Sequence, residues 1–528
     1  MAKYNNKNRA ANGGPTSNST GARSKGRKNN YRKNGERKDR MDTREDIKGV
    51  NTTGINDPVW YSMSPEITKS VASIPFSPAI GAKGVIKPSW PLTHNTNSVA
   101  SSAIPTLMTL YSNMSIGMSK DLTSPANVAA QKFYTYIRKN QSVYASYEAC
   151  DLMLYILAMN SAWEYHAWMT KMYGLLSTYS PQNYHLPDEF IKACGADPND
   201  LRAHSIEFWG WINIFANRMA SYVVPGEMTY TKRHIYMFSN IFADEQNPHY
   251  KAQFYQFVPF AFYAFDGYGS ENGGRLKAIH TMGTMLNQDN PTLLTYSEIR
   301  SIGESMIQSL GDQDLRAMSG DILKAIGDER VMRLPTLPQD VVCSPIYDGY
   351  MLSQINNATI PNLRPSTCND VDDIMGIYQD GAHGALMHTP KCIATIDNGG
   401  LYADEDAKVR LNMYSDNPTP EDILEATRNV AILGSAVTEL NTCGSDFVVC
   451  AVISTPDAES KRAFVTTNMA MSILNEDATQ WPYVLANGLE TIALLTAFKH
   501  APVVNMLIHT NDDDTPYSWV GAIGDVSN

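Results

Sequence analysis

The stretch YEACDLMLYILAMNSAWEYHAWMTKMYG, residues Tyr147–Gly174, carries the strongest helical pattern in the chain. Apolar residues occupy nearly every side of the 3.6-residue period, and the few interruptions are Asp151, Asn160, Glu164 and Lys171. A helix with so little polar surface is usually buried. We therefore predict a central helix over Tyr147–Tyr173 that ends at Gly174, in a mainly α protein with a few short strands.

Helical spacing continues on both sides of this segment. The predicted helices cover 124–137, 186–194, 201–222, 228–243, 292–309, 313–326, Pro420–Leu440 and about 483–499. The helix at Pro420 has Thr419 as its N-cap. Phe447–Ser454 and Val503–His509 are predicted as short buried strands. Prolines interrupt the pattern after about residue 330, so we expect the body, 121–528, to include a projecting portion whose boundary the sequence does not define.

An aromatic run occupies the segment between residues 254 and 265. It consists of Phe254, Tyr255, Phe257, Phe260, Phe262, Tyr263 and Phe265. Aromatic side chains contribute strongly to protein cores, and they are also enriched at the centres of subunit interfaces. Both interpretations remain open from the sequence, with the core favoured.

Charge is divided unevenly along the chain. The total is −11, yet residues 1–40 contain twelve Lys and Arg against two acidic residues. Residues 41–528 therefore contain 31 Lys and Arg against 52 Asp and Glu. A basic tail of +10 on an acidic body of −21 is typical of an interaction tail.

The first 48 residues are predicted to form a disordered arm that binds RNA. Residues 1–40 contain no Leu, Ile, Val, Phe or Trp, so they cannot bury enough apolar surface to fold. Cations on a flexible chain neutralise phosphates without reading sequence. The predicted RNA-binding residues are Lys3, Lys7, Arg9, Arg23, Lys25, Arg27, Lys28, Arg32, Lys33, Arg37, Lys38 and Arg40. The alternative is a solubility tail or a localisation signal.

Residues 49–120 are rich in proline and are predicted to form an extended arm that tethers one subunit to another. Each proline removes a backbone donor and favours extended geometry before it. The candidate subunit contacts are the aromatic anchors Trp60, Tyr61, Phe76 and Trp90. An ordinary linker is the alternative.

Catalytic motifs are absent from the sequence, so we expect no enzyme, no cofactor and no metal site. His383 and His388 resemble a metal-binding pair only superficially, and the acidic run 512–514 is typical of a solvated loop. The seven dispersed cysteines favour free thiols. No apolar run resembles a signal peptide or a bilayer span, so we expect no stable membrane insertion.

Several segments, in order, resemble picobirnavirus capsid proteins. They are Tyr147–Gly174, YSPQNYHLPDEFIKACG (Tyr179–Gly195), KRHIYMFSNIFAD (Lys232–Asp244), SGDILKAIG (Ser319–Gly327) and VVCSPIYDGYMLSQINNATI (Val341–Ile360). The basic opening MAKYNNKN is also similar. The resemblance covers roughly 133–360, and the last third of the chain carries little of it.

The resemblance implies a mostly helical subunit that dimerises, with the arm before the core exchanged between partners. Such dimers build an icosahedral shell around double-stranded RNA, and the polymerase is a separate protein that the particle can package. The implied location is the virion, and the host cytoplasm during assembly. Some family members process their own N-terminus, but no nucleophile or cleavage site can be assigned here.

Two other functions remain as alternatives to a shell protein. An RNA-coating nucleoprotein would need a basic groove in the folded body, and the charge of −21 argues against one. An enzyme with an unrecognised site would need a pocket of perturbed titratable groups, which no motif indicates.

Overall fold

The computed structural model describes residues 107–139, 147–178, 186–246, 252–267, 273–283, 293–360, 367–381, 384–390, 417–433, 440–442 and 444–454, with shorter pieces at 411, 413, 463–465, 471–472, 498–502, 505–508 and 518–522. The chain divides into two units, Met1–Ser64 and Pro65–Asn528, and all described residues belong to the second. The predicted arm 1–48 and residues 49–106 lie outside the described part.

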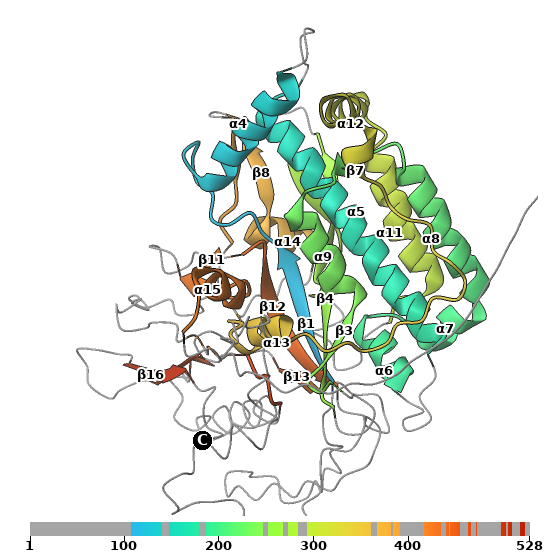
Figure 1. Ribbon diagram of the computed structural model, residues 1–528, viewed down its shortest axis with the longest axis vertical. Helices are drawn as coiled ribbons and strands as arrows, with labels where there is room; N and C mark the ends of the chain where they lie inside the picture. Colours follow the sequence, from blue (N-terminus) through green and yellow to red (C-terminus); the bar gives the residue numbers. More distant parts are fainter. Residues whose placement is uncertain are drawn as a thin grey trace, which may run out of the picture. The chain divides into compact units, whose positions relative to one another are not determined.

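Helix α5, Ala149–Leu176, is the centre of the molecule, as predicted. Its N-terminus is closed by a capping box, in which Glu148 and Asp151 each accept from the other's backbone N–H. It contacts the helices α4 (Pro125–Arg138), α6 (Leu186–Ala193), α8 (Ser205–Met219) and α9 (Thr229–Ser239) and the strands β4 (Phe254–Pro259) and β5 (Ala261–Asp266). Most of its side chains are therefore buried. Figure 1 shows α5 between the sheets and the outer helices.

Gly174 does not end α5, which continues for two more residues. A Cβ at Gly174 would lie 2.8 Å from the backbone nitrogen of Cys343. The glycine is therefore explained by the close approach of the 343 segment, and the predicted helix stop was wrong.

Strand β1, Leu107–Met114, lies in the middle of a five-stranded sheet with the order β13-β12-β1-β4-β3. It pairs antiparallel with β12, Asp446–Ser454, and parallel with β4, Phe254–Pro259. All eight of its residues are buried. The predicted end of the arm 49–120 is therefore wrong. Residues 107–114 are extended, as expected, but they form a core strand of the body, because their apolar side chains pack on both faces of the sheet.

The aromatic run forms β4 and β5, Ala261–Asp266, and the core interpretation is confirmed. Phe262 packs edge-on against Tyr165 with 5.4 Å between ring centroids, and its ring is tilted against Trp168 with 5.2 Å between centroids. These buried rings join α5 to the sheets and are not available as a subunit contact. β5 opens a second sheet of order β5-β6-β8-β9.

The described residues also contain the following helices and strands. The helices are α4 (Pro125–Arg138), α6 (Leu186–Ala193), α7 (Pro198–Ala203), α8 (Ser205–Met219), α9 (Thr229–Ser239), α11 (Tyr296–Ser309), α12 (Gln313–Ile326), η1 (Asp328–Arg330), α13 (Gly349–Asn356), α14 (Cys368–Met375) and α15 (Pro420–Ala426). The strands are β2 (Val224–Pro225), β3 (Ile241–Ala243), β6 (Arg275–Thr281), β7 (Val331–Met332), β8 (Ile377–Asp380), β9 (Ala385–Met387), β10 (Ala431–Leu433), β11 (Leu440–Thr442), β13 (Ala463–Val465), β14 (Met471–Ser472), β15 (Asn505–Ile508) and β16 (Ser518–Ala522).

Most predicted helices are confirmed, with two changes of kind. The segment 228–243 forms α9 and then turns into β3, and 201–222 is divided at His204 into α7 and α8. The strand predictions at Phe447–Ser454 and Val503–His509 are confirmed as β12 and β15, whereas 483–497 lies outside the described residues. Because two sheets occupy the centre, the mainly α description is only partly right.

The long helix predicted over Pro420–Leu440 is wrong after its first two turns. Its start is correct, since Thr419 caps α15 in a capping box with Asp422. The chain then leaves the helix, because the Asn429 carbonyl accepts from the Thr359 backbone at 3.0 Å and Ala431–Leu433 pairs with β11. Tertiary hydrogen bonds and a β-branched sequence thus outweigh the helical spacing.

Candidate functional site

The residues that the sequence singled out for function lie mainly outside the described part of the chain. They are the basic residues of the arm 1–48, the anchors Trp60, Tyr61, Phe76 and Trp90, His383 and the acidic run 512–514. Their roles remain predictions.

His388 is described, and it is a buried structural histidine. Its Nε2 lies 3.0 Å from the Ser115 hydroxyl and its Nδ1 lies 3.1 Å from the Gly376 carbonyl. Its backbone exchanges two 2.9 Å hydrogen bonds with Ser119. Burial lowers the pKa of His388 to about 4, so the ring is neutral near pH 7. Within the described residues, no group of His, Cys, Asp and Glu is arranged to hold a metal ion.

A cluster of charged side chains is buried where α5, α9 and β12 meet; we call it the ionic core. The Glu164 carboxylate on α5 lies 2.7 Å from Nδ1 of His234 and accepts from the Asn160 amide at 2.8 Å. The other ring nitrogen of His234 lies 3.9 Å from the Asp446 carboxylate. Glu164, His234 and Asp446 are each 2% exposed or less, so the histidine lies between two buried carboxylates.

Arg233 supplies the positive charge of the ionic core. Its Nε donates to Asp446 at 2.8 Å, and one terminal nitrogen donates to Gln354 on α13 at 2.8 Å. The other terminal nitrogen donates to Asn429 at 3.3 Å. A single guanidinium therefore joins α9 to β12, to α13 and to the segment after α15, which are far apart in sequence.

The two carboxylates of the ionic core have opposite pKa shifts. Burial raises the pKa of Glu164, although His234 and Asn160 oppose the shift. Burial also penalises ionised Asp446, but the neighbouring Arg233 holds its pKa below the usual range. Asp446 is thus an anion paired with Arg233. This chemistry fixes the packing of distant elements.

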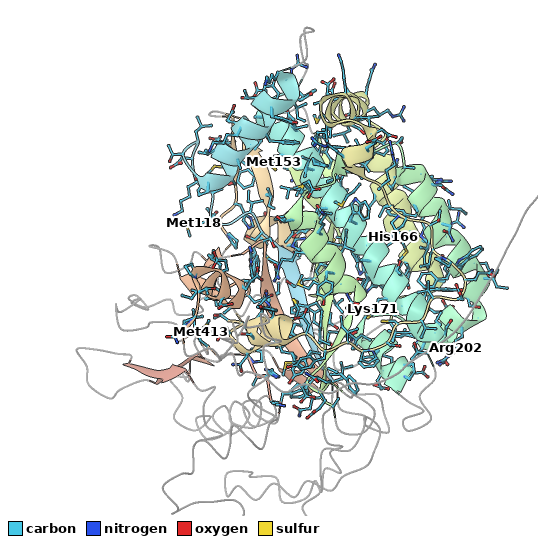
Figure 2. All side chains as sticks on the ribbon, viewed as in Figure 1. Met118, Met153, His166, Lys171, Arg202 and Met413 are labelled. Atoms are coloured by element: carbon cyan, nitrogen blue, oxygen red, sulfur yellow. The ribbon has the colours of Figure 1, made fainter. Side chains whose placement is uncertain are left out.

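Lys171 is a second buried charge on α5, lower on the helix in Figure 2 than His166. Its Nζ donates to the Phe257 carbonyl of β4 at 2.7 Å. Burial lowers the pKa of Lys171. The lysine therefore anchors α5 to the central sheet rather than contacting solvent.

Sequence reasoning noted Glu164 and Lys171 only as interruptions of an apolar helix. A charge inside such a helix requires a buried partner, so the signal for the ionic core was present. The pairings could not be predicted from the sequence, because the residues of the ionic core come from distant segments: Asp446 and its partner Arg233 are 213 residues apart.

Comparisons with known proteins agree with this architecture. The family described as "Picobirnavirus, Capsid protein" matches residues 60–473. The capsid protein precursor of a human picobirnavirus strain from Thailand is 30% identical over 316 residues, which cover 59% of this chain and 55% of that protein. The chain thus matches only about half the length of this relative.

A solved structure described as the X-ray crystallographic structure of the picobirnavirus capsid has the same fold. The TM-score is 0.62 at 18% identity, over 87% of this chain and 92% of that chain. Among the described residues, no helix is both long and apolar enough to cross a bilayer. Because the family match extends over most of the sequence, the chain belongs to the picobirnavirus capsid protein family.

Proposed function

We propose that this protein is a shell subunit, which dimerises and assembles into an icosahedral particle around double-stranded RNA. The observation that carries the proposal is the family match over residues 60–473. The shared capsid fold over 87% of the chain supports it. The role is structural: the ionic core joins distant elements of the body and gives it a defined shape for repeated contacts.

RNA capture belongs, in this proposal, to the basic arm 1–48. The remaining chain is strongly acidic, so its surface repels phosphates and leaves the contact to the arm. Base readout needs ordered side chains, which a Gly-, Asn- and Lys-rich arm does not provide, so binding is independent of sequence. The viral polymerase is a further packaged partner, and the protein is located in the virion after assembly in the host cytoplasm.

The segment 49–106 is proposed as the part exchanged between dimer partners, with Trp60, Tyr61, Phe76 and Trp90 as its anchors. Each of its seven prolines removes a backbone donor and favours extended geometry in the residue before it. It leads into β1 at Leu107, in the middle of the sheet. Because the tether continues directly into a core strand, its contact with a partner would be connected to the folded body without an intervening linker.

The test compares the full chain with a chain that begins at Gly49. Particles are examined by electron microscopy, and their RNA content by the ratio of absorbance at 260 and 280 nm. We expect closed RNA-containing particles from the full chain, and empty particles or soluble dimers from the shorter one. Equal RNA in both would reject the role of the arm, and failure of both to assemble across salt and pH would favour the nucleoprotein alternative.

A further inference from the structure

Helix α8 has one buried face and one exposed apolar stripe. Its inner face is formed by Phe208, Trp211, Ile212, Phe215, Ala216 and Met219, all buried in the core. On the opposite face, Ile206 is 76% exposed and Ile214 is 47% exposed. Gly210 lies between them, one turn from each, and a Cβ built on it would meet no atom within 4 Å. We call Ile206, Gly210 and Ile214 the α8 stripe.

The α8 stripe is not explained by packing inside the described residues. Exposed isoleucines lose the benefit of burial, and a mid-helix glycine costs about 1 kcal/mol relative to alanine. Figure 1 shows α8 at the edge of the helical layer, on the side of α5 away from β1. A glycine between two large apolar residues lets the backbone of another helix approach closely at that point.

Two charges border the same edge of the α8 stripe. Glu207 and Arg218 are eleven residues apart, about three helical turns, so they project on one side of the helix. Both are exposed, and neither makes a salt bridge with another described residue. A partner for this surface therefore needs an apolar centre and one charge of each sign along one edge.

We propose that the partner of the α8 stripe is the α8 stripe of a second copy, packed antiparallel about a two-fold axis at Gly210. This inference rests on the proposed function, which requires contacts between copies. The reversed direction places Ile206 of each copy against Ile214 of the other. It also brings Arg218 of one copy within about 7.5 Å, along the axis, of Glu207 of the other. The arginine side chain leans toward its own helix N-terminus and can cover this distance.

Charge complementarity selects the antiparallel arrangement. A parallel two-fold would carry this edge of the second copy to the opposite side of the helix pair, so Glu207 and Arg218 of the two copies could not meet, and the two helix dipoles would be aligned. The antiparallel arrangement pairs opposite charges and opposed dipoles. A single helix pair buries less than the roughly 1,600 Å² of a standard interface, so this contact is one of several in the assembly.

Cysteine cross-linking tests the geometry directly. At a helix separation of about 8–10 Å, two Cα atoms at the crossing lie about 3.4–5.4 Å apart, close to or within the range that a disulfide spans. Gly210→Cys should therefore give disulfide-linked dimers under mild oxidation, in soluble protein and in particles, on a non-reducing gel. Gly320→Cys is the control, because Gly320 is a mid-helix glycine that, like Gly210, has nothing within 4 Å of an added Cβ, and it is exposed. The parent chain controls for its seven native cysteines.

Each outcome decides the proposal. Cross-linking at 210 but not at 320 supports it. If Gly210→Cys protein forms particles but stays monomeric on the non-reducing gel, the proposal is wrong and the shell function is unaffected. Equal cross-linking at positions 210 and 320 has the same meaning. If Gly210→Cys cross-links only in a chain from which residues 49–106 have been deleted, that segment covers the α8 stripe in the full chain and the proposal is wrong. Absence of particles from the parent chain rejects the shell function, while the soluble protein still reports on α8.

A charge exchange tests the edge contact. In the Gly210→Cys background, Glu207→Arg should reduce cross-linking, because Arg218 of the second copy then faces another arginine. Adding Arg218→Glu should restore it. If the double variant stays as low as the single one, the pairing is not antiparallel as proposed.

Discussion

Helices α5 and α8 pack against each other, yet their charged residues have opposite surroundings. On α5, Glu164 and Lys171 are buried, and they are bonded to α9 and β4 respectively. On α8, Glu207 and Arg218 are exposed, and isoleucines face outward. The difference indicates that α5 holds the subunit together, whereas the outer face of α8 contributes little to the packing of the described residues.

The largest expected effect comes from the two glutamates. Glu164→Ala leaves buried His234 and Asn160 without their acceptor, so we expect a loss of about 3–5 kcal/mol in the free energy of unfolding. Glu207→Ala is the matched change on α8 and should stay within about 0.5 kcal/mol. Urea unfolding of the assembly-free protein measures both. Equal losses would contradict the distinction between the helices.

Glycines give the next largest contrast. A Cβ at Gly303 of α11 would lie 2.8 Å from the Trp211 ring and 2.9 Å from the Tyr165 ring. Gly303→Ala should therefore cost about 1–3 kcal/mol by overpacking. Gly210→Ala meets open space and should instead stabilise the monomer by up to about 1 kcal/mol. Thermal unfolding distinguishes them, and a stabilising Gly303→Ala would show that this interior is less tightly packed than described.

A smaller effect, with a defined pH dependence, is expected at Lys171. Lys171→Met removes the donor to the Phe257 carbonyl and should cost about 1–2 kcal/mol. The pKa of Lys171 is lowered from 10.5 in the folded state, so the unfolded chain binds the proton more readily below that pH. The parent therefore gains stability relative to the variant as pH rises toward 10.5. A difference that stays constant or shrinks with pH would contradict the burial of this amine.

Local signals identified α5, α12 and β12, because each has a clear apolar pattern. They failed where distant residues decide. Residues 107–114 form the middle of a sheet only because β4 and β12 pair with them. The segment after α15 leaves the helix because Asn429 is held by Arg233 and Thr359. The ionic core shows both the strength and the limit of local signals. Glu164 could be noted in the sequence as a charge in an apolar helix, whereas its pairing depends on the topology of the fold.

The division of labour between the acidic body and the basic arm is tested most directly by changing the charge of the arm alone. The twelve Lys and Arg of residues 1–40 are replaced by Gln in one chain, and their order is scrambled at constant composition in another. RNA per particle is then measured at fixed salt. We predict particles from both, RNA near the parent level in the scrambled chain, and a large loss of RNA in the neutral chain. RNA that persists without the charges, or that disappears on scrambling, would contradict sequence-independent electrostatic capture by the arm.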